Sequence, residues 1–145
     1  MTDQHIEAEI QAKGLTAPRV TPADIEESIV SAHYFTAADG QTGKDCGYVP
    51  QNHMPELGLL TFCVLVLRNG FTVTGESACA SPENFDAEVG QKIARANAVN
   101  KIWPLEGYLL KERMYQGSGS IKLVDKPLRD YGVITIHTGA MPPSP

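Results

Sequence analysis

The most constraining feature of the sequence is an apolar run that ends in a tight turn. Residues 59–68 read LLTFCVLVLR, and Asn69-Gly70 follows at once. A run that is apolar at successive positions is typical of a central strand covered on both faces. Asn-Gly accepts the positive φ angles of a two-residue type I′ turn, so the next residues, FTVTG, should return as an antiparallel partner.

A two-residue turn also predicts the register of this hairpin. Arg68 would lie opposite Phe71, and Val66 would lie opposite Val73. The returning strand alternates apolar residues with threonines, so one of its faces should be wetter than the other.

Two helix starts flank the hairpin, each a capping residue followed by proline. Thr21-Pro22 predicts a helix over about residues 22–33, and Ser81-Pro82 predicts a long helix over about residues 82–115. Pro104 should interrupt or kink the long helix.

The long helix has two contrasting faces on a helical wheel. One face carries the larger apolar side chains and is expected to pack on the sheet: Phe85, Val89, Ile93, Ala96, Val99 and Trp103. The opposite face carries the small residues Ala87, Gly90, Ala94 and Ala98. Small residues admit a close second backbone, so we expect a helix there, preferably from a second subunit. The alternative is that the alanines only raise helix propensity.

These elements predict an α+β fold: an antiparallel sheet built around the hairpin at Asn69-Gly70 and covered by the two helices. A chain of 145 residues should form one domain. We place that domain at residues 20–137, after a flexible N-terminal arm (1–19) that could hold a short helical piece before Gly14, and before a frayed tail (138–145). Residues 36–56 show no period and are interpreted as a functional or mobile loop. Late strands are expected at 121–124 and 131–137.

Composition and motifs narrow the function classes. The net charge of −5 argues against general nucleic-acid binding, and the longest apolar run is too short for a membrane span. Cys46, Cys63 and Cys79 lack CxxC spacing, which is typical of free thiols in a reducing cytoplasm.

No catalytic constellation emerges from the sequence. GxSxG, HExxH and GxGxxG do not occur. Cys79 precedes the Ser81 helix start, which could lower its pKa, but it has no adjacent histidine. Cys46 and His53 do not complete a metal-ligand set. We therefore expect neither an enzyme nor a metal or other cofactor.

Basic, amide and aromatic side chains concentrate where the hairpin leads into the long helix. Rings can stack on a flat base, arginines can bind phosphates, and free N–H groups at the Ser81 helix start suit an anion. In the alternative interpretation Phe85 and Trp103 are core residues, and Lys92 and Arg95 only solvate the helix. The candidate ligand-binding residues are Arg68, Asn84, Phe85, Arg95, Asn97, Asn100, Trp103 and Arg113.

Three short motifs stand in a characteristic order along the chain. They are the NGF turn, the SACASPENFD junction and the NKIWPLEGYLL stretch, preceded by TPADIEESIVSAHYFTAADG. Over about residues 20–115 the sequence resembles a family of small tailed-phage accessory proteins labelled by phage genes 49 and 66. The resemblance implies a phage protein made in the host bacterial cytoplasm and implies little about mechanism.

A looser analogy suggests a function. Thoeris anti-defence sponges, which are oligomers that sequester nucleotide signals without cleaving them, are similar in size and in lacking catalytic residues. The leading hypothesis is therefore a homo-oligomer that sequesters a cyclic oligonucleotide or cyclic ADP-ribose type of signal. The alternatives are a protein-binding module that inhibits a host protein or supports phage replication, and a purely structural or assembly role.

Overall fold

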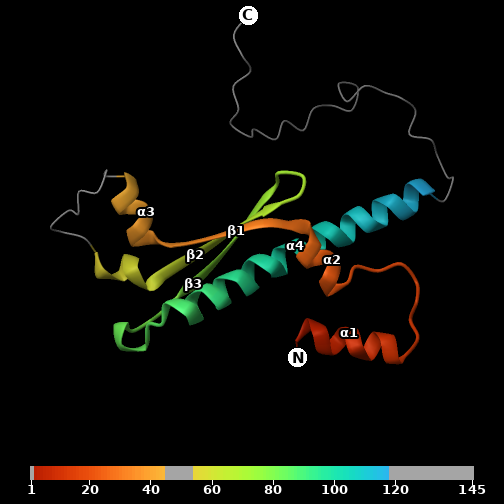
Figure 1. The fold of residues 1–145 in the computed structure, drawn as a ribbon, viewed down its shortest axis with the longest axis horizontal. Coiled ribbons are helices and arrows are strands. Elements are labelled where there is room, and N and C mark those ends of the chain that lie inside the picture. Colours follow the sequence, from red (N-terminus) through yellow and green to blue (C-terminus); the bar gives the residue numbers. More distant parts are fainter. Residues whose placement is uncertain (1, 45–53, 118–145) are drawn as a thin grey trace, which may run out of the picture. The chain divides into compact units, whose positions relative to one another are not determined.

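The computed structural model describes residues 2–44 and 54–117 (Figure 1). The expected α+β fold class is confirmed. The chain divides into two compact units, Met1–Lys111 and Glu112–Pro145. The sheet and its core belong to the first unit, and residues 112–117 of the second unit are helical. The elements in chain order are α1 (Asp3–Ala12), α2 (Pro22–Ser28), β1 (Ile29–Thr36), α3 (Ala37–Lys44), the 3-10 turn η1 (Pro55–Leu59), β2 (Leu60–Leu67), β3 (Thr72–Ala78), the 3-10 turn η2 (Pro82–Asn84) and α4 (Ala87–Gly117).

Several expectations fall outside the residues that the structure describes. They are the late strands at 121–124 and 131–137, the tail at 138–145, and the central part of the loop at 36–56. The N-terminal arm, which we expected to be flexible, carries helix α1, and Gly14 adopts φ +64° just beyond it.

The sheet is antiparallel with strand order β1-β2-β3, so β2 is the central strand, as expected. Burial alternates along β2. One set of side chains, beginning with Thr61 and including Cys63 and Leu65, is buried, whereas the alternate set is only half-buried. Although the strand is apolar on both faces, the described part of the chain covers only one of them fully.

Helix α2 begins where expected but ends early. The Thr21 hydroxyl accepts the Asp24 amide, and the Asp24 carboxylate accepts the Thr21 amide at 2.7 Å, which completes a capping box. The prediction that this helix continues to residue 33 is wrong, because residues 29–36 form the edge strand β1. The segment IVSAHYFT is rich in β-branched and aromatic residues, and pairing with β2 gives its backbone the hydrogen bonds that a helix would otherwise supply.

The hairpin at Asn69-Gly70 is present, but its predicted register is wrong. The loop has three residues, 68–70, in which the Gly70 amide donates to the Leu67 carbonyl and Gly70 adopts φ +84°. This arrangement is typical of a type I turn followed by a left-handed residue. Val73 consequently pairs with Leu65 instead of Val66. A shift of one residue exchanges the two faces of a strand, so it decides which side chains of β2 enter the core.

The expected orientation of the long helix is also wrong. The buried side of α4 carries Gly90, Ala94, Ala98, Ile102 and Glu106, and this side packs on the sheet. A Cβ atom built at Gly75 on β3 would lie 2.1 Å from the Ala94 carbonyl oxygen. The small residues of α4 therefore allow close packing on the sheet and not on a second helix. Because Ala94 is fully buried, the substitution Ala94→Arg would place a charged side chain in the core.

Half of the larger apolar stripe expected to pack on the sheet, namely Val89, Ile93 and Ala96, is exposed. Val89 and Ile93 are about half exposed, whereas Val99 and Trp103 pack against the edge of the core. The compact core consists of Ile25, Cys63, Leu65, Leu67, Val73, Ala94, Ala98 and Ile102.

The start of the long helix differs from the expectation at Ser81. Residues 82–84 form only η2, and α4 begins at Ala87, where the Asp86 side chain accepts the Val89 amide at 2.9 Å. Asp86 is therefore the helix cap, and the anion-binding helix start that we expected at Ser81 is only the short turn η2. Helix α4 runs continuously through Pro104.

Part of the expected loop at 36–56 is helical. The Thr36 and Asp39 side chains each accept the other residue's amide, at 3.1 and 2.8 Å, at the start of α3. This Thr-x-x-Asp pattern is the same capping signal as at Thr21, and it predicts a helix start better than hydrophobic periodicity does here.

We expect Gly75→Ala to lower the free energy of unfolding by at least about 2 kcal/mol, because a methyl group there meets the backbone of α4. Urea denaturation measures this loss. Gly107→Ala is the matched control: nothing lies within 4 Å of its Cβ position. That variant should be stabilised by about 0.5–1 kcal/mol through helix propensity. Equal stabilities of the two variants would contradict the close contact between helix and strand.

A second prediction concerns the capping box. Hydrogen bonds from the backbone and side chain of Thr21 lower the pKa of Asp24. A folded-state pKa below the unfolded-state value means that the carboxylate stabilises the fold above the unfolded-state pKa. This contribution is lost as the pH falls through the folded-state pKa. Asp24→Asn should cost about 0.5 kcal/mol at pH 7 and progressively less below about pH 4.

Thermal unfolding over a pH series measures this difference. Glu27→Gln, with the same change of charge on the same helix, is the control and should show a smaller effect. A difference between Asp24→Asn and the wild type that stays constant from pH 7 to pH 2 would contradict the assignment.

Candidate functional site

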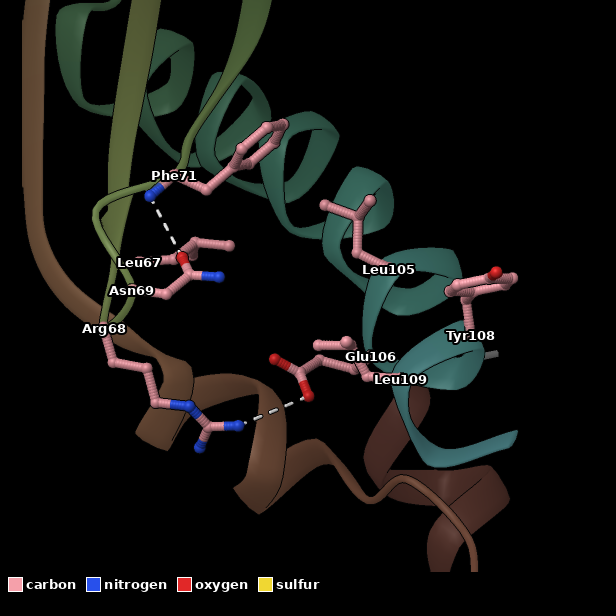
Figure 2. Close-up of a pocket in the computed structure, with 8 residues that line it drawn as sticks. All are labelled: Leu67, Arg68, Asn69, Phe71, Leu105, Glu106, Tyr108 and Leu109. Carbon is pink, nitrogen blue, oxygen red and sulfur yellow. Dashed lines mark hydrogen bonds and ion pairs between the residues drawn. The ribbon is translucent and has the colours of Figure 1, made fainter. Parts of the chain in front are cut away.

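A groove of about 240 Å³ lies between the hairpin tip and α4 (Figure 2). One wall comes from the turn after β2 and the other from the part of α4 that follows Pro104. We call this groove the tip groove. Its lining residues are Leu67, Arg68, Asn69, Phe71, Leu105, Glu106, Tyr108 and Leu109.

The wall at the hairpin is held by the turn itself. The Asn69 side chain accepts the Phe71 amide at 3.0 Å, and the Leu67 amide donates to the Phe71 carbonyl at 2.8 Å. The Arg68 amide is fixed from the other side by the Ser28 carbonyl at 2.9 Å. These bonds hold the backbone at Phe71, whose side chain points toward α4 while it stays 55% exposed (Figure 2).

The wall at α4 continues the stripe that packs on the sheet. Ile102 is fully buried, and Glu106 lies one turn further along. Leu105 and Leu109 flank Glu106 and are each more than a third exposed, and Tyr108 is 71% exposed. Large, partly exposed apolar side chains therefore lie on the part of α4 that faces the hairpin tip.

An ion pair crosses the tip groove. An Arg68 Nη2 atom lies 3.6 Å from a Glu106 Oε2 atom, and the Glu106 side chain is only 11% exposed. Leu67, Leu105 and Leu109 line the same groove as this carboxylate, and an unpaired charge that is so little exposed would be costly. Arg68 is half exposed and can reach both the carboxylate and the solvent. The groove is thus apolar, with one nearly neutralised charge pair.

Of the eight residues predicted to bind a ligand, Arg68 lies in the tip groove. Asn84 and Phe85 line a different hollow, of about 200 Å³, together with Cys79 and Ile93. Ser77 and Ala78, at the end of β3 far from the hairpin tip, also line this hollow, and a strand of seven residues is about 23 Å long. The predicted cluster is therefore divided between the two ends of the sheet.

Arg95 takes part in a polar network beside the core. Its guanidinium donates to a Glu26 carboxylate oxygen at 2.7 Å. Burial acts to lower the pKa of Arg95, but the Tyr34 hydrogen bond and the Glu26 charge outweigh it, so the pKa is raised. For the Cys63 thiol, burial acts in the other direction and raises the pKa, and Tyr34 and Arg95 oppose only part of that effect. Arg95 is thus committed to internal partners.

The remaining predicted residues do not join a common site either. The Trp103 indole donates to Asp3 of α1 at 3.2 Å, and the Asn97 amide donates to the Glu76 carbonyl at 2.8 Å. Asn100 is exposed on α4. Arg113 belongs to the second compact unit.

Across residues 2–44 and 54–117, no three His, Cys, Asp or Glu side chains lie close enough together to hold a metal ion. Cys79 lies beside η2 and not at the start of a long helix, and its thiol donates to the Ser81 carbonyl. None of the helices in these residues is both long and apolar enough to span a membrane.

The sequence reasoning missed most of the tip groove. Phe71, Leu105, Glu106, Tyr108 and Leu109 were not named as site residues, although one signal was available. Stepping by four residues from Gly90 along the small face reaches Ala94, Ala98, Ile102 and then Glu106. A carboxylate at the end of an otherwise apolar stripe indicates a partly buried charge that needs a partner.

The fold and the groove define a small α+β protein that presents an apolar recess beside a paired arginine. A comparison with family models places it more closely. Residues 20–114 match the phage protein (N4 Gp49/phage Sf6 gene 66) family, and the chain belongs to this family. The match includes every residue that lines the tip groove. No curated protein and no solved structure matches the chain.

We expect Arg68→Ala to lower the free energy of unfolding by about 1 kcal/mol, because it leaves the nearly buried Glu106 carboxylate without its cation. The loss should shrink in a Glu106→Gln background, and a double-mutant cycle in urea measures the coupling. Lys92→Ala breaks the exposed pair with Glu88 and is the control, with a change within about 0.5 kcal/mol. Equal losses for Arg68→Ala in both backgrounds would contradict the pairing.

Proposed function

We propose that this phage accessory protein acts by stoichiometric binding and not by catalysis, and that it binds an apolar segment of a host or phage protein in the tip groove. The observation that carries the proposal is the composition of the groove. It has two exposed aromatic rings, two partly exposed leucines and one arginine around a single recess. Aromatic residues and arginine are enriched among the residues that dominate protein-protein binding energy.

The charges in the groove favour a protein segment over a phosphorylated ligand. Arg68 is already paired with Glu106, so a phosphate would have to displace a carboxylate that has little access to water. Arg95 is the other arginine of the first unit that we predicted to bind a ligand, and it is hydrogen-bonded to Glu26 and Tyr34. A chain of net charge −5 adds a general repulsion toward polyanions.

A second candidate is the nucleotide-derived immune signal, and one observation favours it. Arg68 and two exposed aromatic rings, Phe71 and Tyr108, line the same groove. Rings can stack on a base, and a carboxylate such as Glu106 can accept hydrogen bonds from ribose hydroxyl or exocyclic amino groups. In this alternative the protein would sequester the signal in the host cytoplasm without cleaving it.

Photo-crosslinking in infected cells tests the leading proposal. A photoreactive phenylalanine analogue replaces Tyr108, and the same analogue at Lys92, on an exposed part of α4, is the control. We expect a discrete crosslinked protein from position 108, absent from position 92 and lost when Leu109→Asp is added. Crosslinks of equal pattern from both positions would contradict a specific segment in the groove.

Calorimetry separates the two candidates. Wild-type protein is titrated with cyclic oligonucleotides and cyclic ADP-ribose isomers, together with Arg68→Ala and Tyr108→Ala. Binding that falls about tenfold or more in both variants would assign the groove to the nucleotide signal and replace the leading proposal. No heat with any nucleotide, together with the specific crosslink, supports the protein segment.

A further inference from the structure

The sheet has a second apolar surface, on the face opposite α4. The register places one set of alternating side chains of all three strands on this side, which we call the open face. Its members are Ser31, His33, Phe35, Leu60, Phe62, Val64, Val66, Thr72, Thr74, Glu76 and Ala78. None of them is fully buried in the described structure.

The centre of the open face is built as a packing surface. Every outward residue of β2 is apolar, and the Phe35 and Phe62 rings stack with centroids 5.6 Å apart. An antiparallel sheet with one solvated face normally alternates apolar residues with polar ones along each strand. A central strand that lacks this alternation indicates a surface that is covered in the functional state.

The open face carries few charged side chains. Its outward residues on β1 and β2 include no Asp, Glu, Lys or Arg, and Glu76 on the edge strand β3 is its one carboxylate. That carboxylate lies 3.9 Å from Lys101 of α4, so its charge is partly neutralised at the edge. A charged partner would therefore have no complementary group at the centre of this face.

We infer that the open face packs on the open face of a second copy of this chain, forming a two-layered sandwich of sheets. The chain as a whole carries a net charge of −5, which makes most contacts between copies repulsive. The centre of the open face, formed by the outward residues of β2, is an uncharged and apolar exception, and a second copy presents the same surface. A two-fold axis in the interface lets each Phe62 and Val64 meet apolar residues of the other copy.

The open face is small for an interface between two proteins. Eleven side chains per copy fall below the 20–30 residues a side of a standard interface. The dimer is therefore reversible, with dissociation in the micromolar range, and the sheets pack about 10 Å apart with their strands within about 30° of each other. This contact leaves the tip groove, on the α4 side of the sheet, free for its own partner.

Sedimentation equilibrium of the full chain between about 1 and 200 µM tests the inference. The wild type should pass from monomer to dimer within this range. Val64→Lys should shift the dissociation constant upward by at least about tenfold, while Val89→Lys, the same substitution on an exposed turn of α4, should leave it unchanged. Thr74→Lys, exposed on the same face and outside the core, serves as a second variant if Val64→Lys does not fold, and it should also weaken the dimer.

Two outcomes overturn the inference. A wild type that stays monomeric at 200 µM would show that the face is left bare or is covered by residues 118–145 of the same chain. A dimer that resists both lysines on the open face but dissociates with Val89→Lys would place the contact on α4. Circular dichroism of each variant confirms that the fold is retained.

Discussion

The rest of the structure depends on the close approach of α4 to β3 at Gly75. The space for a Cβ atom there is already taken by the backbone at Ala94 and Ala98. Only a glycine opposite a small-residue face of the helix permits this contact. The contact in turn determines which side of α4 faces the sheet. A leucine or valine in place of Ala94 or Ala98 would push the backbones of α4 and β3 apart. The core is consequently thin on the helix side and relies on Leu65, Ile102 and Ile25 for its larger side chains.

This constraint redistributes the apolar residues of the chain. With the small face of α4 turned inward, Val89 and Ile93 remain exposed, and beyond Ile102 the inward stripe passes the end of the strands and meets the hairpin tip. On the far side of the sheet, the outward residues of β2 stay half-buried. In the described residues, apolar surface thus persists in the tip groove and on the open face, in addition to Val89 and Ile93, and surfaces of this kind are typical of binding sites for partners.

The basic residues of the first unit mostly serve the fold. Arg95 bonds to Glu26 and Tyr34, Arg68 pairs with Glu106, and Lys101 lies near Glu76. A protein that bound phosphates through these groups would have to exchange internal partners for external ones. This is why we place the function of this phage family member in apolar recognition first, with the nucleotide signal as the competing candidate at the same groove.

The sequence by itself determined the features that local chemistry controls. A capping residue before a proline started α2, Asn-Gly with its apolar flank produced the hairpin, and the continuous apolar run predicted the central strand, because each depends on neighbours in sequence. Other features needed contacts between distant segments. Residues 29–36 form a strand because they pair with β2. The three-residue hairpin loop shifts the partner of Val73 from Val66 to Leu65. The side of α4 that is buried was decided by Gly75, 19 residues before Ala94. The site followed the same division: Arg68 could be named from its place at the turn, but Glu106 and Tyr108 joined it only when the packed helix brought them to the hairpin tip.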